Sequence, residues 1–474
     1  MRIGGGLGTV ALAGLLGRAA AGASSQQNDA VVGNRVDKGL LTAGPLPARA
    51  KRVIWIHHYG APSQVDTFDY KPMLEKMHGQ EMPRSVMEKS GVRVSGMTSA
   101  QSSFPLIKSL APFSQHGESG AWVSGLLPYQ AKIADDLCFI KSLWTEHVNH
   151  DPAGHFLFTG SQLQGRPSTG AWVSFALGTD NADLPNFVVL NSMGLAPNGL
   201  SVDLWGPGFL ASKHQGVQFR SSDEPVLYVD SPAGVSAQMR QAEFDTIRKL
   251  SELQYAESGD PEIQSKISQY EMAAHMQLSV PEVSDLSKEP KHILDMYGPD
   301  VQRPNTFAKN CLLARRLIER GVKFVQIVHN GWDHHNAIAR THPIDCASTD
   351  QPSAALVMDL KQRGMLDDTL IVAGGEFGRT PFAQGVFTAA YGRDHHGGCF
   401  TTWMAGAGVN AGHSIGETDD FAFNIVKDPH TIHDLHATVL HILGIEHEKL
   451  TYHYQGRDFR LTDVSGTLIK PFLS

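Results

Sequence analysis

Short apolar runs, rich in β-branched residues, alternate along the chain with longer segments of helical hydrophobic spacing. The runs lack the polar–apolar alternation that is typical of a sheet with one solvated face, so they predict strands buried on both faces. The predicted strands lie at 52–60, 137–144, 184–192, 322–331, 369–373 and 399–408. With helices between them, the pattern indicates an α/β fold in three layers, α/β/α, around a mostly parallel central sheet.

Helical segments are predicted at 306–321, 354–364 and 431–445, and a further one over about 120–136. Two mid-chain segments, 232–256 and 261–280, lack Gly and Pro over most of their length and carry charges at helical spacing. They predict two long, solvent-facing helices, inserted near 232–280 as a hairpin or cap. No internal repeat and no linker divides the chain, which favours a single domain over residues 50–467.

The first 27 residues have the pattern of an export signal. One arginine precedes an apolar, glycine-rich stretch, and small residues suited to signal-peptidase cleavage follow it. The stretch is too short and too rich in glycine for a stable transmembrane span. It resembles the tail of a twin-arginine signal whose paired arginines would lie further upstream. The segment therefore predicts an exported protein, periplasmic or extracellular, with a flexible tail as the alternative.

The composition is that of a globular protein, with 41% hydrophobic and 19% charged residues. The formal net charge is −8, and no basic run suggests a nucleic-acid surface. The four cysteines form no CxxC pair, so their spacing allows one or two disulfides but does not require them. Histidine is unusually frequent at 23 residues, and many histidines adjoin an aspartate or another histidine. This count favours metal binding, since neutral imidazole is a common metal ligand.

Carboxylates follow three of the predicted strands. Glu376 and Asp333 stand where strands end, and Asp66 lies in the loop after the first strand. In open α/β sheets, ligands bind beyond the carboxyl ends of the strands. Carboxylates gathered there repel one another unless cations neutralise them. The segments "GWDHHN" and "GRDHHGG" add histidines, a mixture that suits one or two divalent ions such as zinc or manganese better than calcium.

Several motifs are similar to those of a known superfamily. The segment "LDDTLIVAGGEFG" resembles the strand of sulfatases and alkaline phosphatases that ends in a metal-binding carboxylate, and "TIHDLHATVLHILGI" resembles their C-terminal helix. More specifically, "GAPSQVDTFDYKP", "GWDHHN", "GGEFGRTP" and "GRDHHGG" resemble an exported bacterial family labelled sulfatase-like, the domain-of-unknown-function 1501 family. The resemblance spans about residues 50–467. It implies an alkaline-phosphatase-like core with metals at the carboxyl edge of the sheet.

The resemblance also implies a set of metal ligands. It matches Asp66 to the first-strand carboxylate, Asp333 and His335 to a ligand pair, Glu376 to the motif carboxylate, and His395 to a late histidine ligand. Three departures stand out. The motif aspartate is replaced by Glu376 and is followed by a phenylalanine, which removes a ligand from a second metal site. The Asp333–His335 spacing is shorter than in the phosphatases, and no CxPSR or SxPSR segment for a formylglycine is present.

In this superfamily the nucleophile lies after the second strand, at a helix N-terminus, where free N–H groups favour an anion. The matching segment here is "SLWTEHVNHDPAGHFLFTG". Thr145 could serve as a metal-activated nucleophile, and His150 as a metal ligand or general acid. The alternative is that Asn149 and His150 only hydrogen-bond the turn.

Arg379 follows the motif carboxylate by three residues. A guanidinium beside a metal site can hold two oxygens of phosphate or sulfate. The alternative is a salt bridge from Arg379 to Asp394 or Glu376. Taken together, the sequence predicts an exported metal-dependent hydrolase of phosphate or sulfate esters, with a small anionic ester or a sulfated or phosphorylated glycan as substrate. The alternative is a non-catalytic anion- or glycan-binding protein on the same scaffold.

Overall fold

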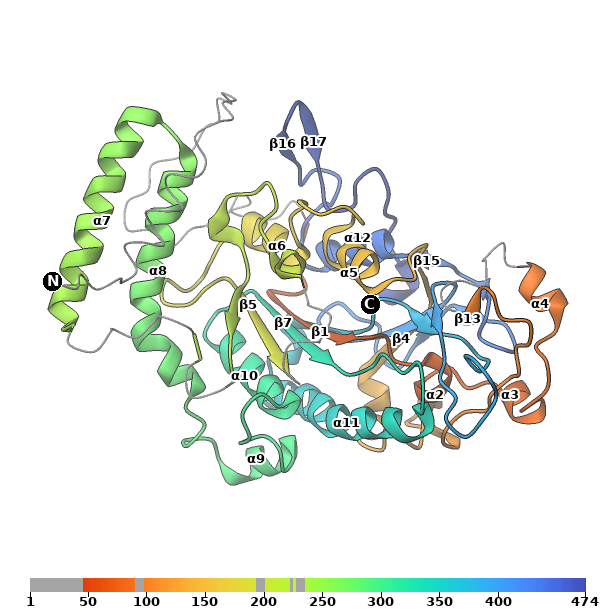
Figure 1. The fold of residues 1–474 in the computed structure, drawn as a ribbon. Coiled ribbons are helices and arrows are strands. Elements are labelled where there is room, and N and C mark those ends of the chain that lie inside the picture. The colour runs from red at the N-terminus through yellow and green to blue at the C-terminus, as the bar shows by residue number, and fades with distance from the viewer. Residues whose placement is uncertain (1–45, 90–97, 193–200, 222–224, 227–234) are drawn as a thin grey trace, which may run out of the picture. The chain divides into compact units, whose positions relative to one another are not determined.

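A computed structural model describes residues 46–89, 98–192, 201–221, 225–226 and 235–474 (Figure 1). The predicted signal peptide at residues 1–27 lies outside these ranges. Within them, no helix is both long and apolar enough to cross a membrane.

In the described residues the central sheet has nine strands, in the order β12-β4-β11-β8-β1-β7-β5-β6 with β15 beside β4 (Figure 1). All neighbouring strands are parallel except β11, which runs antiparallel to β4 and β8. The strands are β1 (Arg52–Tyr59), β4 (Leu137–Trp144), β5 (Phe187–Ser192), β6 (Val217–Phe219), β7 (Phe324–Asn330), β8 (Thr369–Gly374), β11 (Phe400–Gly406), β12 (Ser414–Ile415) and β15 (His430–Thr431). The predicted mostly parallel sheet is therefore confirmed.

Helices cover both faces of this sheet, with α10 and α11 on one side and α5, α6 and α12 on the other (Figure 1). Alternate residues of β1 belong to two separate hydrophobic cores. Ile54 and Ile56 pack in the core on the α10–α11 side. Val53 and Trp55 pack in the core on the α6–α12 side. The three predicted layers follow from this double burial. The helices are α2 (Gln64–Thr67), α3 (Pro72–Lys76), α4 (Arg84–Lys89), α5 (His150–Thr159), α6 (Thr169–Leu177), α7 (Ala237–Ser258), α8 (Pro261–Ser284), α9 (Lys291–Tyr297), α10 (Phe307–Glu319), α11 (Ile338–Gln362) and α12 (Ile432–Ile442).

The predicted helix at 120–136 is wrong over its first half. Residues Ala121–Ser124 form β3, which pairs with β2 (Phe113–His116), and a 3-10 helix follows at Gln130–Asp136. Gly125 and Pro128 between them interrupt a helix, and the alternating burial of β3 suits a hairpin. In the mid-chain segment, α7 and α8 pack against each other at the place where two long helices were predicted.

Three neighbouring parallel strands end at the same edge of the sheet. Tyr59 of β1 lies opposite Asn330 of β7, and His57 opposite Gly374 of β8. The loops that leave these strands are therefore side by side. Gly60 lets them approach: its φ is +107°, and a Cβ there would lie 2.5 Å from the backbone nitrogen of Asp333.

Candidate metal centre

Asp333 lies in the loop that follows β7. The N–H of Trp332 donates to the carbonyl of Tyr59 at 3.3 Å, which fixes this loop against the end of β1. The Asp333 side chain is 40% exposed, whereas most of its neighbours are buried. The loop therefore presents one carboxylate to solvent at the carboxyl edge of the sheet.

A short antiparallel ladder brings a second segment to the same place. Strand β9 (Gly378–Arg379) pairs with β10 (His395–His396), so that His395 stands opposite Arg379. The carboxylate of Asp394 accepts from the N–H of His395 at 2.9 Å and from the N–H of Thr98 at 2.7 Å. These bonds hold the backbone of His395 in a fixed position.

The third segment of the cluster is the start of helix α5. After β4, the chain turns into α5, whose first residue is His150, with Asn149 in extended conformation as the N-cap. The side chain of Asn149 makes no capping hydrogen bond. The start of α5 therefore delivers an imidazole from a helix N-terminus to the edge where Asp333 lies.

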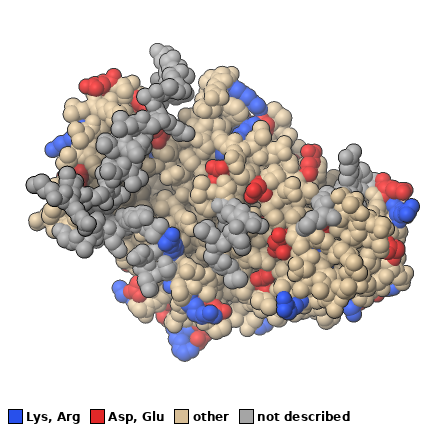
Figure 2. Space-filling model, viewed as in Figure 1, with Lys and Arg blue, Asp and Glu red and all other residues tan. Residues whose placement is uncertain are grey.

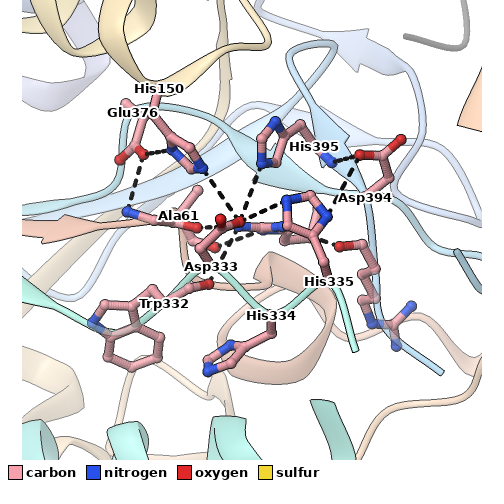
Figure 3. Close-up of polar contacts among 12 residues, drawn as sticks. Ala61, His150, Trp332, Asp333, His334, His335, Glu376, Asp394 and His395 are labelled. Atoms are coloured by element: carbon pink, nitrogen blue, oxygen red, sulfur yellow. Dashed lines mark hydrogen bonds and ion pairs between the residues drawn. The ribbon is translucent and has the colours of Figure 1, made fainter. Parts of the chain in front are cut away.

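The three histidines surround one carboxylate oxygen (Figure 3). Asp333 Oδ1 lies 2.8 Å from His335 Nε2 and 3.2 Å from the Nε2 atoms of both His150 and His395. One ligand atom from each of the four residues can be chosen so that all lie within 4.8 Å of one another. Of the predicted ligands, Asp333, His335 and His395 are thus brought together, and His150 joins them.

In each imidazole of the cluster, the Nδ1 atom lies within hydrogen-bond distance of a protein oxygen. His150 Nδ1 lies 2.5 Å from Glu376 Oε1, and His395 Nδ1 lies 2.5 Å from the carbonyl of Val148. His335 Nδ1 lies 2.6 Å from Gln384 Oε1. Because these oxygens accept, the Nδ1 atoms carry protons, and the Nε2 atoms that face Asp333 are free to bind a metal.

The pKa values of several groups in the cluster are shifted from their ordinary values. Burial alone would raise the pKa of Asp333, but the three histidines and Arg379 hold it far below its usual value. Burial would lower the pKa of His150, but contacts with Asp333 and Glu376 raise it to about 9. Burial lowers the pKa of His395. In the metal-free protein a proton on His150 thus occupies a position that a metal ion would compete for.

The donor set fits a divalent transition metal. Three imidazole nitrogens and one carboxylate oxygen form the kind of ligand set that zinc and its first-row neighbours prefer. His150 Nε2 is buried and, although 3.2 Å from Asp333 Oδ1, has no partner in hydrogen-bond geometry among the described residues. A buried polar atom without a hydrogen-bond partner destabilises the fold, and a cation bound between the ligands would give this nitrogen a partner.

Glu376, which was predicted as a metal ligand, lies outside the group formed by Asp333 and the three histidines. It is fully buried, and Oε1 also accepts from the N–H of Gly60 at 3.0 Å. Its other oxygen lies 3.6 Å from His57 Nε2, and the residue is not part of the four-residue group. The geometry assigns Glu376 to the orientation of His150. The next residue, Phe377, packs on both His150 and His395, with ring centroids 5.1 and 4.5 Å away.

Asp66 lies outside the cluster altogether. Its carboxylate forms a fully buried ion pair with Arg393 Nε at 2.8 Å and accepts from the Ser63 hydroxyl at 2.6 Å and from the N–H of Leu110 at 2.9 Å. Burial would raise the pKa of Asp66, but Arg393 and its hydrogen bonds lower it. The match of Asp66 to a metal carboxylate is therefore not supported by the geometry, which gives it a structural role.

Arg379 forms a salt bridge, but with a partner that the sequence did not suggest. Its Nη2 lies 2.7 Å from Asp333 Oδ1, not beside Asp394 or Glu376. The guanidinium is 1% exposed and donates further to the carbonyls of Gly60, Ala61 and Arg393. With its donors turned into the protein, Arg379 holds Asp333 in place and has little capacity left for a substrate oxygen.

Thr145 is not part of the cluster. Its buried hydroxyl accepts from the N–H of His147 at 3.3 Å, and its own N–H donates to the carbonyl of Gly397 at 2.9 Å. The residue that the sequence did not reveal is Gln384, which holds His335. No spacing or composition signal marks Gln384, because it lies 49 positions away from its partner.

Replacing Glu376 by glutamine is expected to weaken metal binding by about 10–100-fold without changing the number of ions bound at saturation. The charged acceptor that fixes the His150 ring would be lost, whereas all four ligands would remain. A competition titration against a chelator measures this affinity, with the exposed Glu75→Gln as control. Loss of the ion even at saturating metal would instead identify Glu376 as a ligand.

Comparisons with known proteins place the chain in a family. The model of the family described as "Protein of unknown function (DUF1501)" matches residues 50–473. A search among curated proteins gave no match.

The similar solved structures include three at low sequence identity. Ps i-CgsB, solved with k-i-k-neocarrahexaose, is 12% identical, with 83% of this chain and 72% of that chain covered and a TM-score of 0.36. The PsFucS1 sulfatase from Pseudoalteromonas sp. is 14% identical, with 84% and 69% covered and a TM-score of 0.34. The phosphonate monoester hydrolase SpPMH from Silicibacter pomeroyi is 11% identical, with 73% and 71% covered and a TM-score of 0.32. Because the family model covers almost all of the described chain, this protein belongs to the DUF1501 family.

Proposed function

We propose that this protein is a metal-dependent hydrolase of phosphate or sulfate esters, with one divalent transition-metal ion held by His150, Asp333, His335 and His395. One observation carries the proposal: three imidazole Nε2 atoms converge on a carboxylate oxygen while each Nδ1 is held by a protein acceptor. Such an arrangement is typical of a metal site whose ligands are fixed by a surrounding layer of hydrogen bonds.

The arrangement of the residues favours one ion over two. The carboxylates that could serve a second site are engaged elsewhere, Asp66 with Arg393 and Glu376 with His150 and Gly60. The ring of Phe377 packs against two of the ligands, where an additional ligand would be needed. When bound, the metal would polarise the ester and neutralise negative charge that develops on its oxygens.

The chain itself supplies access, orientation and a favourable potential for an anion. The cluster is open on the side of Asp333, the most exposed of its members. The N-terminus of α5 starts at His150, so its free N–H groups add partial positive charge. These features suit a small anionic ester, including a sulfated or phosphorylated glycan. The pattern of residues 1–27 supports the further proposal that the protein acts outside the cytoplasm.

The test is a metal analysis coupled to an activity screen. Elemental analysis of the purified protein is expected to find about one zinc, manganese or iron ion per chain. A panel of p-nitrophenyl phosphate, bis-p-nitrophenyl phosphate and p-nitrophenyl sulfate is expected to show turnover that a chelator abolishes and the same metal restores. Turnover that survives complete removal of metal would contradict the proposal.

A second candidate is a non-catalytic protein that binds an anion or glycan at the same centre. The observation that favours it concerns the predicted nucleophile: the Thr145 hydroxyl is buried and accepts a hydrogen bond from the N–H of His147. Bound metal without turnover on the whole ester panel, together with metal-dependent binding of an ester, would select this candidate.

A further inference from the structure

A cavity of about 430 Å³ lies at the β4 edge of the central sheet, beside β12 and the β13–β14 hairpin (Glu417–Thr418 and Ile425–Lys427). It shares no residue with the metal centre. Its charged lining comprises Asp69, Lys71, Lys141, Glu417, Lys427 and Asp428. The volume is within the range of about 300–1,000 Å³ that is typical of small-molecule sites.

Two of the three lysines in this cavity already have partners. Lys71 Nζ lies 3.1 Å from Asp69 Oδ1 and donates to the carbonyl of Thr418 at 3.1 Å. The other oxygen of Asp69 accepts from the Thr418 hydroxyl. At the rim, Lys427 pairs with Glu417 at 3.0 Å, and both side chains are more than half exposed. The carboxylates nearest to these lysines are therefore engaged.

Lys141 is the lysine without such a partner. It projects from the middle of β4 into the cavity and is partly buried. Among the described residues, no carboxylate lies within the 4.0 Å of an ion pair with its ammonium. Burial lowers the pKa of Lys141, and Lys71 adds to this shift, whereas the carboxylates of Asp69 and Glu417 oppose it. The inner wall of the cavity thus carries an ammonium that has no ion-pair partner among the described residues.

We propose that this cavity binds a tetrahedral oxyanion, sulfate or phosphate, with Lys141 as its main contact. Lys71 lies beside it, and the cavity has more room than a bare ion needs, so the oxyanion can be free or attached to a small organic group such as a sugar. The site is separate from the proposed hydrolytic centre and does not depend on it.

Isothermal titration calorimetry at constant ionic strength tests the proposal, with inorganic sulfate, galactose 6-sulfate and unsulfated galactose as probes. The unmodified protein and Asp333→Ala are titrated in parallel, so that binding at the metal centre is separated from binding in the cavity. Both proteins are expected to bind sulfate. Lys141→Met is expected to bind it about tenfold more weakly or worse, since a hydrogen bond to a charged group is lost. Methionine keeps the length of the side chain and removes the charge, so the fold is expected to persist.

The control is Lys76→Met, which removes an exposed lysine of α3 and is expected to leave binding unchanged. Tighter binding of galactose 6-sulfate than of sulfate supports the site with a glycan as the source of the anion; equal or weaker binding supports it with the free ion. Three results would overturn the proposal: no sulfate binding by the folded protein, equal binding by Lys141→Met, or complete loss of binding in Asp333→Ala. Metal content and ester turnover are expected to be unaffected in Lys141→Met, which keeps this test apart from that of the hydrolase.

Discussion

Replacing Asp333 by alanine is expected to remove the bound metal and the ester hydrolysis together. Asp333 supplies the one carboxylate on which the three Nε2 atoms converge, and without it the site would hold only neutral ligands. Loss of a charged ligand should leave less than about a tenth of the metal bound at neutral pH, since metal-site affinity depends steeply on ligand charge. Elemental analysis and turnover of the ester panel are measured on the same preparation.

The controls separate metal loss from unfolding. Asp333 also accepts from the buried Arg379, so alanine leaves that guanidinium without its carboxylate. Asp333→Asn keeps an oxygen for Arg379 and is expected to fold normally while binding metal more weakly. Asp367→Ala removes an exposed carboxylate next to β8 and should change neither quantity. Full metal content in Asp333→Ala would refute the proposed ligand set.

Replacing Asp66 by leucine is expected to destabilise the protein by about 3–5 kcal/mol, because the buried Arg393 would lose its partner. Both side chains of this pair are 0% exposed. The folded fraction should nevertheless keep its metal, since Asp66 is not part of the cluster. Urea unfolding followed by circular dichroism measures the change, and the metal content is determined below the transition.

The double variant Asp66→Leu/Arg393→Met provides the matched control. With both charges replaced by apolar groups, much of the lost stability should return, and the coupling free energy reports the pair. The low pKa of Asp66 gives a second measurement. The stabilisation by ionised Asp66 is present above its ordinary pKa of 3.8 and is lost as the pH falls through the lower pKa of the folded protein. The stability difference between unmodified protein and Asp66→Leu should therefore shrink in acid. Metal loss from folded Asp66→Leu would restore Asp66 as a ligand.

The layers of the fold could be predicted from the order of strands and loops, and three of the four clustered residues were predicted as metal ligands. Asp333 was expected at this edge because parallel strands end there, and the family resemblance matched His335 and His395 to the same set of ligands. Asp66 and Glu376 also follow strands at this edge, yet they point elsewhere. Position after a strand does not reveal the direction of a side chain.

The remaining details depend on contacts between distant segments. For His150 the sequence left open a ligand, a general acid and a turn residue, and only the placement of α5 brings its Nε2 atom to Asp333. The acceptor Gln384 has no sequence signal, since any loop amide can serve once the backbone places it. For Arg379 the sequence left open a clamp on substrate oxygens and a salt bridge to Asp394 or Glu376, but its partner is Asp333, which lies close to Gly60.

The contact between Arg379 and Asp333 has a consequence for how a metal ion would bind. A guanidinium that is always charged holds the Asp333 carboxylate, and protein acceptors hold the three imidazoles, so each ligand has a fixed orientation of its own. Metal binding is therefore expected to occur at a preformed site, without folding of the chain around the ion.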